Sequence, residues 1–63
     1  MLEIYIERWS AAGGSVAYPW SAWDQGKRVT MGEAFETPDA AEEAARAWCR
    51  ATLQREPDRV RRL

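Results

Sequence analysis

Aromatic and acidic side chains carry most of the chemistry in this chain, because its 63 residues include no histidine and only one cysteine. Four tryptophans, Trp9, Trp20, Trp23 and Trp48, are more aromatic bulk than so small a core can hide. Large exposed aromatic area on a small protein usually marks a contact surface. The composition therefore predicts a protein that binds rather than one that catalyses.

The missing residue types exclude most catalytic and metal chemistry. Histidine is the commonest general base and metal ligand. Cys49 alone builds neither a thiolate zinc site nor an intramolecular disulfide, and its place beside the core-facing helix stripe predicts a small buried hydrophobe. Gly13-Gly14 lacks the lysine and the following helix of a phosphate loop. We expect no enzyme activity, no catalytic residue, no cofactor and no metal.

Residues 2–9 alternate between apolar and polar side chains, which predicts a β-strand. Leu2, Ile4 and Ile6 occupy one face, and the other face is acidic and aromatic. That outer face is either a solvated surface or a contact surface for a basic partner, and the small core favours contact. Trp20 or Trp23 extends this surface, depending on the chain's course at Pro19. The predicted protein-binding residues are Glu3, Tyr5, Glu7, Trp9 and Trp20.

Two further extended segments follow. Residues 16–23 are rich in β-formers but contain Pro19, which removes a hydrogen-bond donor from a central strand. We therefore expect a bend there, with 16–18 pairing with the first strand and 20–23 with the third. Residues 24–27 (DQGK) predict a hairpin, and 28–35 predict the third strand.

A helix is predicted from Pro38 to about Gln54. Thr37 is a favourable N-cap, and Pro38 suits the first helical position. Glu42 and Arg46 have the spacing of an i,i+4 ion pair, and Pro57 ends or kinks the helix.

These elements predict an α+β fold in which a three-stranded antiparallel sheet packs on one α-helix (β-β-β-α). Residues 1–56 form a single domain, and 57–63 form a short basic C-terminal tail. Glu33 falls on the inward side of its strand, so it lies at the sheet edge or a bulge at Gly32 shifts the register. The expected core contains Leu2, Ile4, Ile6, Val16, Val29, Met31, Phe35, Ala41, Ala44, Ala45 and Trp48.

The net charge is −1, but residues 55–63 carry four arginines against two acids. This basic tail is a frayed end or, alternatively, an arm that contacts phosphates. No apolar run approaches 18 residues and no signal-peptide pattern is present, so we expect a soluble cytoplasmic protein without membrane contact. Strand-like residues follow Met1 at once, which suggests a complete short gene product.

Residues 26–32 (GKRVTMG), 35–37 (FET) and 41–48 (AEEAARAW) resemble the plant ethylene-response-factor DNA-binding domain and, more loosely, the arm-binding domain of tyrosine integrases. The resemblance implies three strands backed by one helix, and DNA contact through the exposed sheet face. Glu3 and Glu7 depart from that pattern, because phosphate repels them. The predicted nucleic-acid-binding residues of this alternative are Arg8, Lys27, Arg28, Arg59, Arg61 and Arg62.

Three hypotheses for function follow. The first is a protein-binding module that occludes a basic surface of a host protein, since in size and surface the chain resembles small phage-encoded inhibitors such as anti-CRISPR proteins. The second is a sheet-reading DNA-binding module. The third is a homodimeric regulatory protein whose aromatic face is its own interface.

Overall fold

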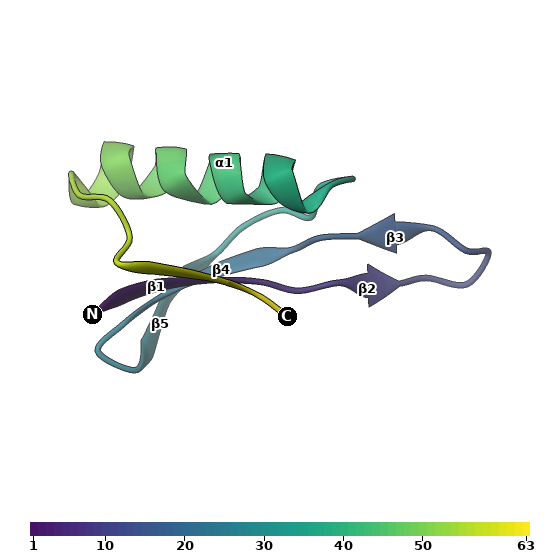
Figure 1. The fold of residues 1–63 in the computed structure, drawn as a ribbon, viewed down its shortest axis with the longest axis horizontal. Coiled ribbons are helices and arrows are strands. Elements are labelled where there is room, and N and C mark those ends of the chain that lie inside the picture. Colours follow the sequence, from purple (N-terminus) through teal and green to yellow (C-terminus); the bar gives the residue numbers. More distant parts are fainter.

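One helix covers one face of a four-stranded sheet, and a two-stranded ribbon projects from the sheet's end (Figure 1). This computed structural model describes all 63 residues. The sheet contains β1 (Leu2–Ile6), β4 (Trp20–Asp24), β5 (Lys27–Met31) and β6 (Arg59–Arg62), in the order β5-β4-β1-β6. The ribbon pairs β2 (Trp9–Ser10) with β3 (Val16–Ala17). The α+β class is confirmed, but the sheet has a fourth strand, which pairs in parallel with β1.

The central strand β1 follows the alternation of its sequence. Leu2, Ile4 and Ile6 are at most 1% exposed and face the helix. They pack with Trp20 and Ala22 of β4, which stand opposite Ile6 and Ile4 in the antiparallel register. The inner face of the two middle strands therefore forms most of the core.

Helix α1 (Pro38–Trp48) starts as its sequence predicts. The Thr37 Oγ1 accepts a hydrogen bond from the Ala40 N–H at 3.1 Å, and Pro38 opens the first turn. Ala41 and Ala45 are fully buried, and their small side chains let the helix backbone lie close to the sheet. The chain then widens into a π-helical segment, η1 (Cys49–Leu53). A π-helix has more residues per turn than an α-helix, and Cys49 and Leu53 continue the core-facing side.

Trp20 fills the end of the core near the ribbon. Its indole is 6% exposed and lies against Trp48, with the ring centroids 6.0 Å apart. Gly32 also packs on this ring, because a Cβ at Gly32 would overlap the Trp20 indole. Pro19 is buried between β3 and β4, where it separates the ribbon from the sheet. The expected interruption at Pro19 is therefore present, but the expected division of the pairing is wrong in part, because Trp20–Asp24 pairs with β1 as well as with β5 and Tyr18 bridges to Phe35.

The third predicted strand is shorter than expected. It ends at Met31, and Phe35 forms only an isolated bridge with Tyr18. The register between β4 and β5 shifts at Val29, so the irregularity lies there rather than at Gly32. Val29 and Met31 are 45% and 56% exposed, and their prediction as core residues is wrong. Glu33 lies beyond the strand and is exposed.

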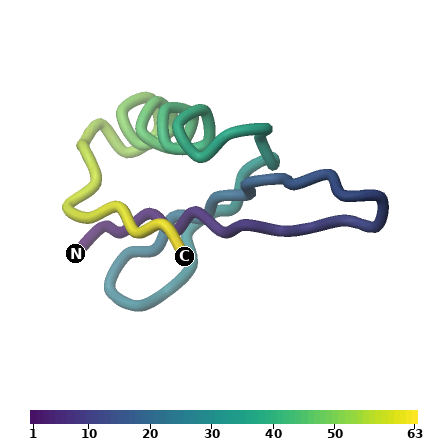
Figure 2. The backbone as a smooth tube through the Cα atoms, turned by 45° about the vertical axis from the view of Figure 1, so that its right-hand side comes forward, coloured from purple at the N-terminus to yellow at the C-terminus, as the bar shows by residue number.

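The C-terminal residues form strand β6 rather than a frayed tail. Figure 2 shows this segment beside the N-terminal strand. The Asp58 carboxylate accepts the Leu2 N–H at 2.7 Å, and the Leu63 N–H donates to the Ile6 carbonyl at 2.8 Å. The separation into a domain of 1–56 and a tail of 57–63 is therefore wrong, because the last strand completes the sheet. Neither α1 nor η1 has the length and apolar character needed to span a membrane.

Candidate functional site: the open face of the sheet

The face of the sheet opposite α1 is uncovered (Figure 1). The strand register aligns its outward residues in two transverse rows. The first row, from edge to edge, is Arg59, Glu3, Trp23 and Arg28. The second is Arg61, Tyr5, Ser21 and Met31. Glu3, Tyr5 and Trp23 thus lie on the two middle strands, whereas three of the four edge positions hold an arginine and the fourth holds Met31.

Tyr5 and Trp23 form an edge-to-face pair at the centre of this open face. Their ring centroids are 6.0 Å apart and the planes meet at 89°. The Trp23 indole N–H donates to the Ser21 Oγ at 2.9 Å, and the Tyr5 hydroxyl donates to the Glu3 Oε2 at 3.3 Å. Neighbouring side chains therefore hold both rings in place before any ligand arrives.

An open hollow of about 460 Å³ lies beside this aromatic pair. The hollow is lined by Glu3, Tyr5, Glu7, Ser21, Trp23, Gly26 and Leu63. Its only ionisable side chains besides that of Tyr5 are those of Glu3 and Glu7. An acidic, aromatic depression is suited to binding cations rather than to bond-making chemistry.

The structure brings together three of the five residues predicted to bind protein. Glu3, Tyr5 and Glu7 line the hollow. Trp9 lies on the ribbon, is 55% exposed, and donates its indole N–H to the Glu7 Oε1 at 3.4 Å. Trp20 is buried beneath the helix, so its prediction as an exposed anchor is wrong.

Trp23 takes the place on the open face that Trp20 was expected to fill. Strand β4 begins after Pro19, and its pairing with β1 turns Trp20 inward and Trp23 outward. The sequence did contain one useful signal: the two tryptophans are an odd number of residues apart, so on a regular strand they must lie on opposite faces of the sheet. Pro19 concealed which of them faced out.

The cations proposed for nucleic-acid binding do not form one stripe. Arg59 and Arg61 lie on one edge of the open face, and Arg28 lies on the other. Arg59 is 3.8 Å from Glu3, so it partly neutralises the carboxylate beside it. The open face is therefore mixed in charge rather than uniformly acidic. Arg8 and Lys27 are exposed away from the hollow.

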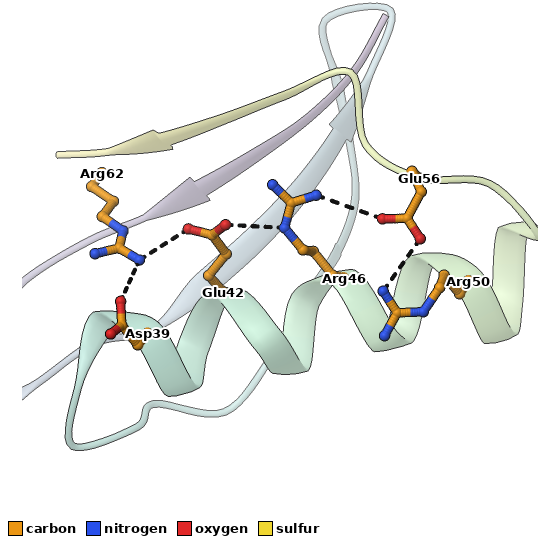
Figure 3. A network of polar contacts seen from close by, with 6 residues as sticks. All are labelled: Asp39, Glu42, Arg46, Arg50, Glu56 and Arg62. Atoms are coloured by element: carbon orange, nitrogen blue, oxygen red, sulfur yellow. Dashed lines mark hydrogen bonds and ion pairs between the residues drawn. The ribbon is translucent and has the colours of Figure 1, made fainter.

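The sixth of these cations, Arg62, belongs to a charged groove of about 260 Å³ on the helix side (Figure 3). Its guanidinium donates to Asp39 at 2.7 Å and to Glu42 at 3.0 Å, and these carboxylates raise the pKa of Arg62. The hydrogen bond from Arg46 holds the pKa of Glu42 below its ordinary value.

The chain of alternating charges in Figure 3 continues from Arg46 through Glu56 to Arg50. Its members pair with one another, which satisfies their charges and ties β6 to α1. This groove is therefore a structural clamp, and the open face offers the better candidate site.

The lone cysteine lies in the core rather than on the open face. Cys49 is fully buried, as predicted, and burial raises the pKa of its thiol. No group of three or more His, Cys, Asp or Glu side chains is placed to hold a metal ion. No protein family, curated protein or solved structure matches this chain.

Proposed function

We propose that this protein is a non-enzymatic binding module that occludes a basic surface of another protein with the open face of its sheet. The observation that carries the proposal is the uncovered Tyr5–Trp23 pair, flanked by Glu3 on β1 and by Glu7 just after its end. Tyrosine and tryptophan are enriched among the residues that dominate binding energy at interfaces. The two carboxylates give that centre a preference for positive charge.

The ribbon enlarges the proposed contact surface. No charged residue stands between Arg8 and Asp24, and Trp9 projects from this segment with 55% of its surface exposed. When a partner covers this ribbon and its exposed indole, no charged group has to be removed from water, so the electrostatic cost of binding is low. A phage-encoded inhibitor such as an anti-CRISPR protein is the biological class that this size and surface suggest.

DNA binding is the alternative that the edge arginines favour. Arg28, Arg59 and Arg61 flank the aromatic pair, and a nucleic acid lying across the face would meet all three. Glu3 and Glu7 stand between them and would repel phosphates. The central carboxylates make protein the better-supported partner.

The deciding experiment compares two double charge reversals. Glu3→Lys with Glu7→Lys alters the open face, whereas Glu33→Lys with Glu43→Lys makes the same change in net charge at exposed residues elsewhere. Each tagged variant is used to capture partners from nuclease-treated lysate, and captured proteins are then tested in purified form. We expect the wild type and the control pair to bind one protein at its basic surface, and the open-face pair to lose it.

Other outcomes contradict the proposal. Binding that survives the open-face reversal would show that this face is not the working surface. Capture that depends on nucleic acid and falls steeply with salt would favour the DNA-binding alternative. A tight dimer that the open-face reversal dissociates would favour the homodimer.

A further inference from the structure

The hollow on the open face has a marked excess of hydrogen-bond acceptors. The indole N–H of Trp23 and the hydroxyl of Tyr5 already donate to Ser21 and Glu3. The carboxylates of Glu3 and Glu7 retain oxygen lone pairs beyond the bonds they accept from Tyr5 and Trp9. A ligand that matches the hollow must therefore bring donors, and preferably positive charge.

The two aromatic rings, which stand at right angles to each other, give the hollow a second reason to prefer a cationic ligand. A cation placed over the face of a tryptophan or tyrosine is attracted by the ring quadrupole. Tyr5 and Trp23 meet at 89°, so their faces point in different directions around the depression. The aromatic ring faces and the carboxylates thus both attract a cation that enters the hollow.

We propose that this hollow receives one arginine side chain of the partner protein. A guanidinium is planar, stacks on aromatic faces and carries five N–H donors in a fork that suits carboxylates. A lysine ammonium is a compact, strongly hydrated charge, and it uses fewer of these features at once. The inference rests on the proposed function, and it names the group on the basic partner that the open face recognises.

Arg59 is an internal competitor for the same carboxylate. Its guanidinium lies 3.8 Å from the Glu3 Oε2, and both side chains are on the outer face of neighbouring strands. Removal of this charge frees Glu3 for an incoming guanidinium. The structure therefore predicts that Arg59→Gln tightens binding, a direction that simple loss of folding would not produce.

The test is an NMR titration of the purified protein with N-acetyl-arginine amide, which follows the Trp23 indole N–H signal. The probes for comparison are N-acetyl-lysine amide and N-acetyl-citrulline amide, which is a neutral analogue of arginine with a similar shape. We expect saturable shifts of the Trp23 signal with arginine, weaker binding of lysine and no saturation with citrulline. The signals of the buried Trp20 and the half-buried Trp48, which both pack in the core away from the open face, serve as internal controls.

Two variants connect the binding to the carboxylates. Glu3→Gln with Glu7→Gln keeps the shape of both side chains and should weaken arginine binding about fivefold, in line with the loss of two exposed charge pairs. Glu33→Gln with Glu43→Gln, at exposed residues outside the hollow, should leave the affinity unchanged. Arg59→Gln should strengthen binding.

Equal binding of citrulline and arginine, unchanged affinity in the open-face glutamine variant, or shifts that miss Trp23 would each overturn the arginine assignment. Preference for lysine would overturn it in favour of an ammonium ligand. The proposed function would still stand if the arginine titration fails but the wild type captures a partner protein and the Glu3/Glu7 charge reversal abolishes that capture. Arginine binding without any such partner would refute the proposed function and leave the hollow's specificity intact.

Discussion

Replacement of Gly32 by alanine tests how the core is closed beside the ribbon. A Cβ at this position would overlap the indole of Trp20, which is 6% exposed and is held from another side by Trp48. The ring cannot move outward without uncovering the core. We therefore expect Gly32→Ala to destabilise the fold although it adds only one methyl group.

The size of the effect follows from two opposing terms. Overpacking a well-filled site destabilises by about 1–3 kcal/mol. Alanine also has less conformational freedom than glycine in the unfolded chain, which raises the free energy of unfolding by about 0.4–1 kcal/mol. This gain applies here because Gly32 does not require a positive φ. The net loss is about 1.5 kcal/mol, which in a domain of this size lowers Tm by about 6–12 °C.

A double-mutant cycle followed by circular dichroism and urea unfolding separates this clash from other effects. Trp20→Leu removes the ring that the new methyl group would meet, so the double variant should lose about 1 kcal/mol less than the sum of the two single variants. Gly26→Ala is the matched control: its Cβ would meet nothing within 4 Å, and its strain should add independently to Trp20→Leu. A stable Gly32→Ala variant, or strict additivity in the Gly32 cycle, would refute the packing argument.

Further measurements address the clamp on β6 and the titrating groups. Arg62→Gln should lower the urea midpoint more than Arg61→Gln, which breaks no ion pair, and high salt should reduce the difference. The pKa of Asp58 lies below its ordinary value because the Leu2 N–H and then Arg55 stabilise its charge, so the wild type should lose stability as pH falls below about 4. Asp58→Asn should reduce this acid-side slope in pH-dependent urea unfolding. Burial raises the pKa of Cys49, so stability should fall above about pH 8.5, and Cys49→Ala should flatten that alkaline slope.

The local elements of this protein were well determined by the sequence. The alternation in residues 2–6 identified β1 and its buried face, because side chains on a strand alternate between the two sides of the sheet. The start of α1 was equally clear, since Thr37 and Pro38 satisfy the helix terminus through local contacts. The Glu42–Arg46 pair, at 3.0 Å, was predictable for the same reason.

The candidate site was only partly predictable. Glu3 and Tyr5 lie on β1 and Glu7 directly follows it, so the alternation along residues 2–9 alone placed them together. The choice between Trp20 and Trp23 depended on where pairing resumes after Pro19, and the Val29 bulge depended on the register between β4 and β5. A register shift of one residue reverses which side chains are exposed. The exposed face of such a segment is therefore decided by its pairing with the neighbouring strand and not by its own sequence.

Strand β6 shows most clearly what tertiary structure decided. Val60 is the only apolar residue among the four in this strand, and no alternation in 59–62 marks a strand as it does in 2–6. Helix α1 and η1 carry the chain back across the sheet, where the open edge of β1 offers backbone hydrogen bonds and the helix offers carboxylates to Arg62. The sequence by itself determined the helix, the hairpin and the polarity of β1, because those depend on neighbours along the chain. The fourth strand, the outward Trp23 and the edge arginines depend on partners distant in sequence, and only the assembled sheet supplies them.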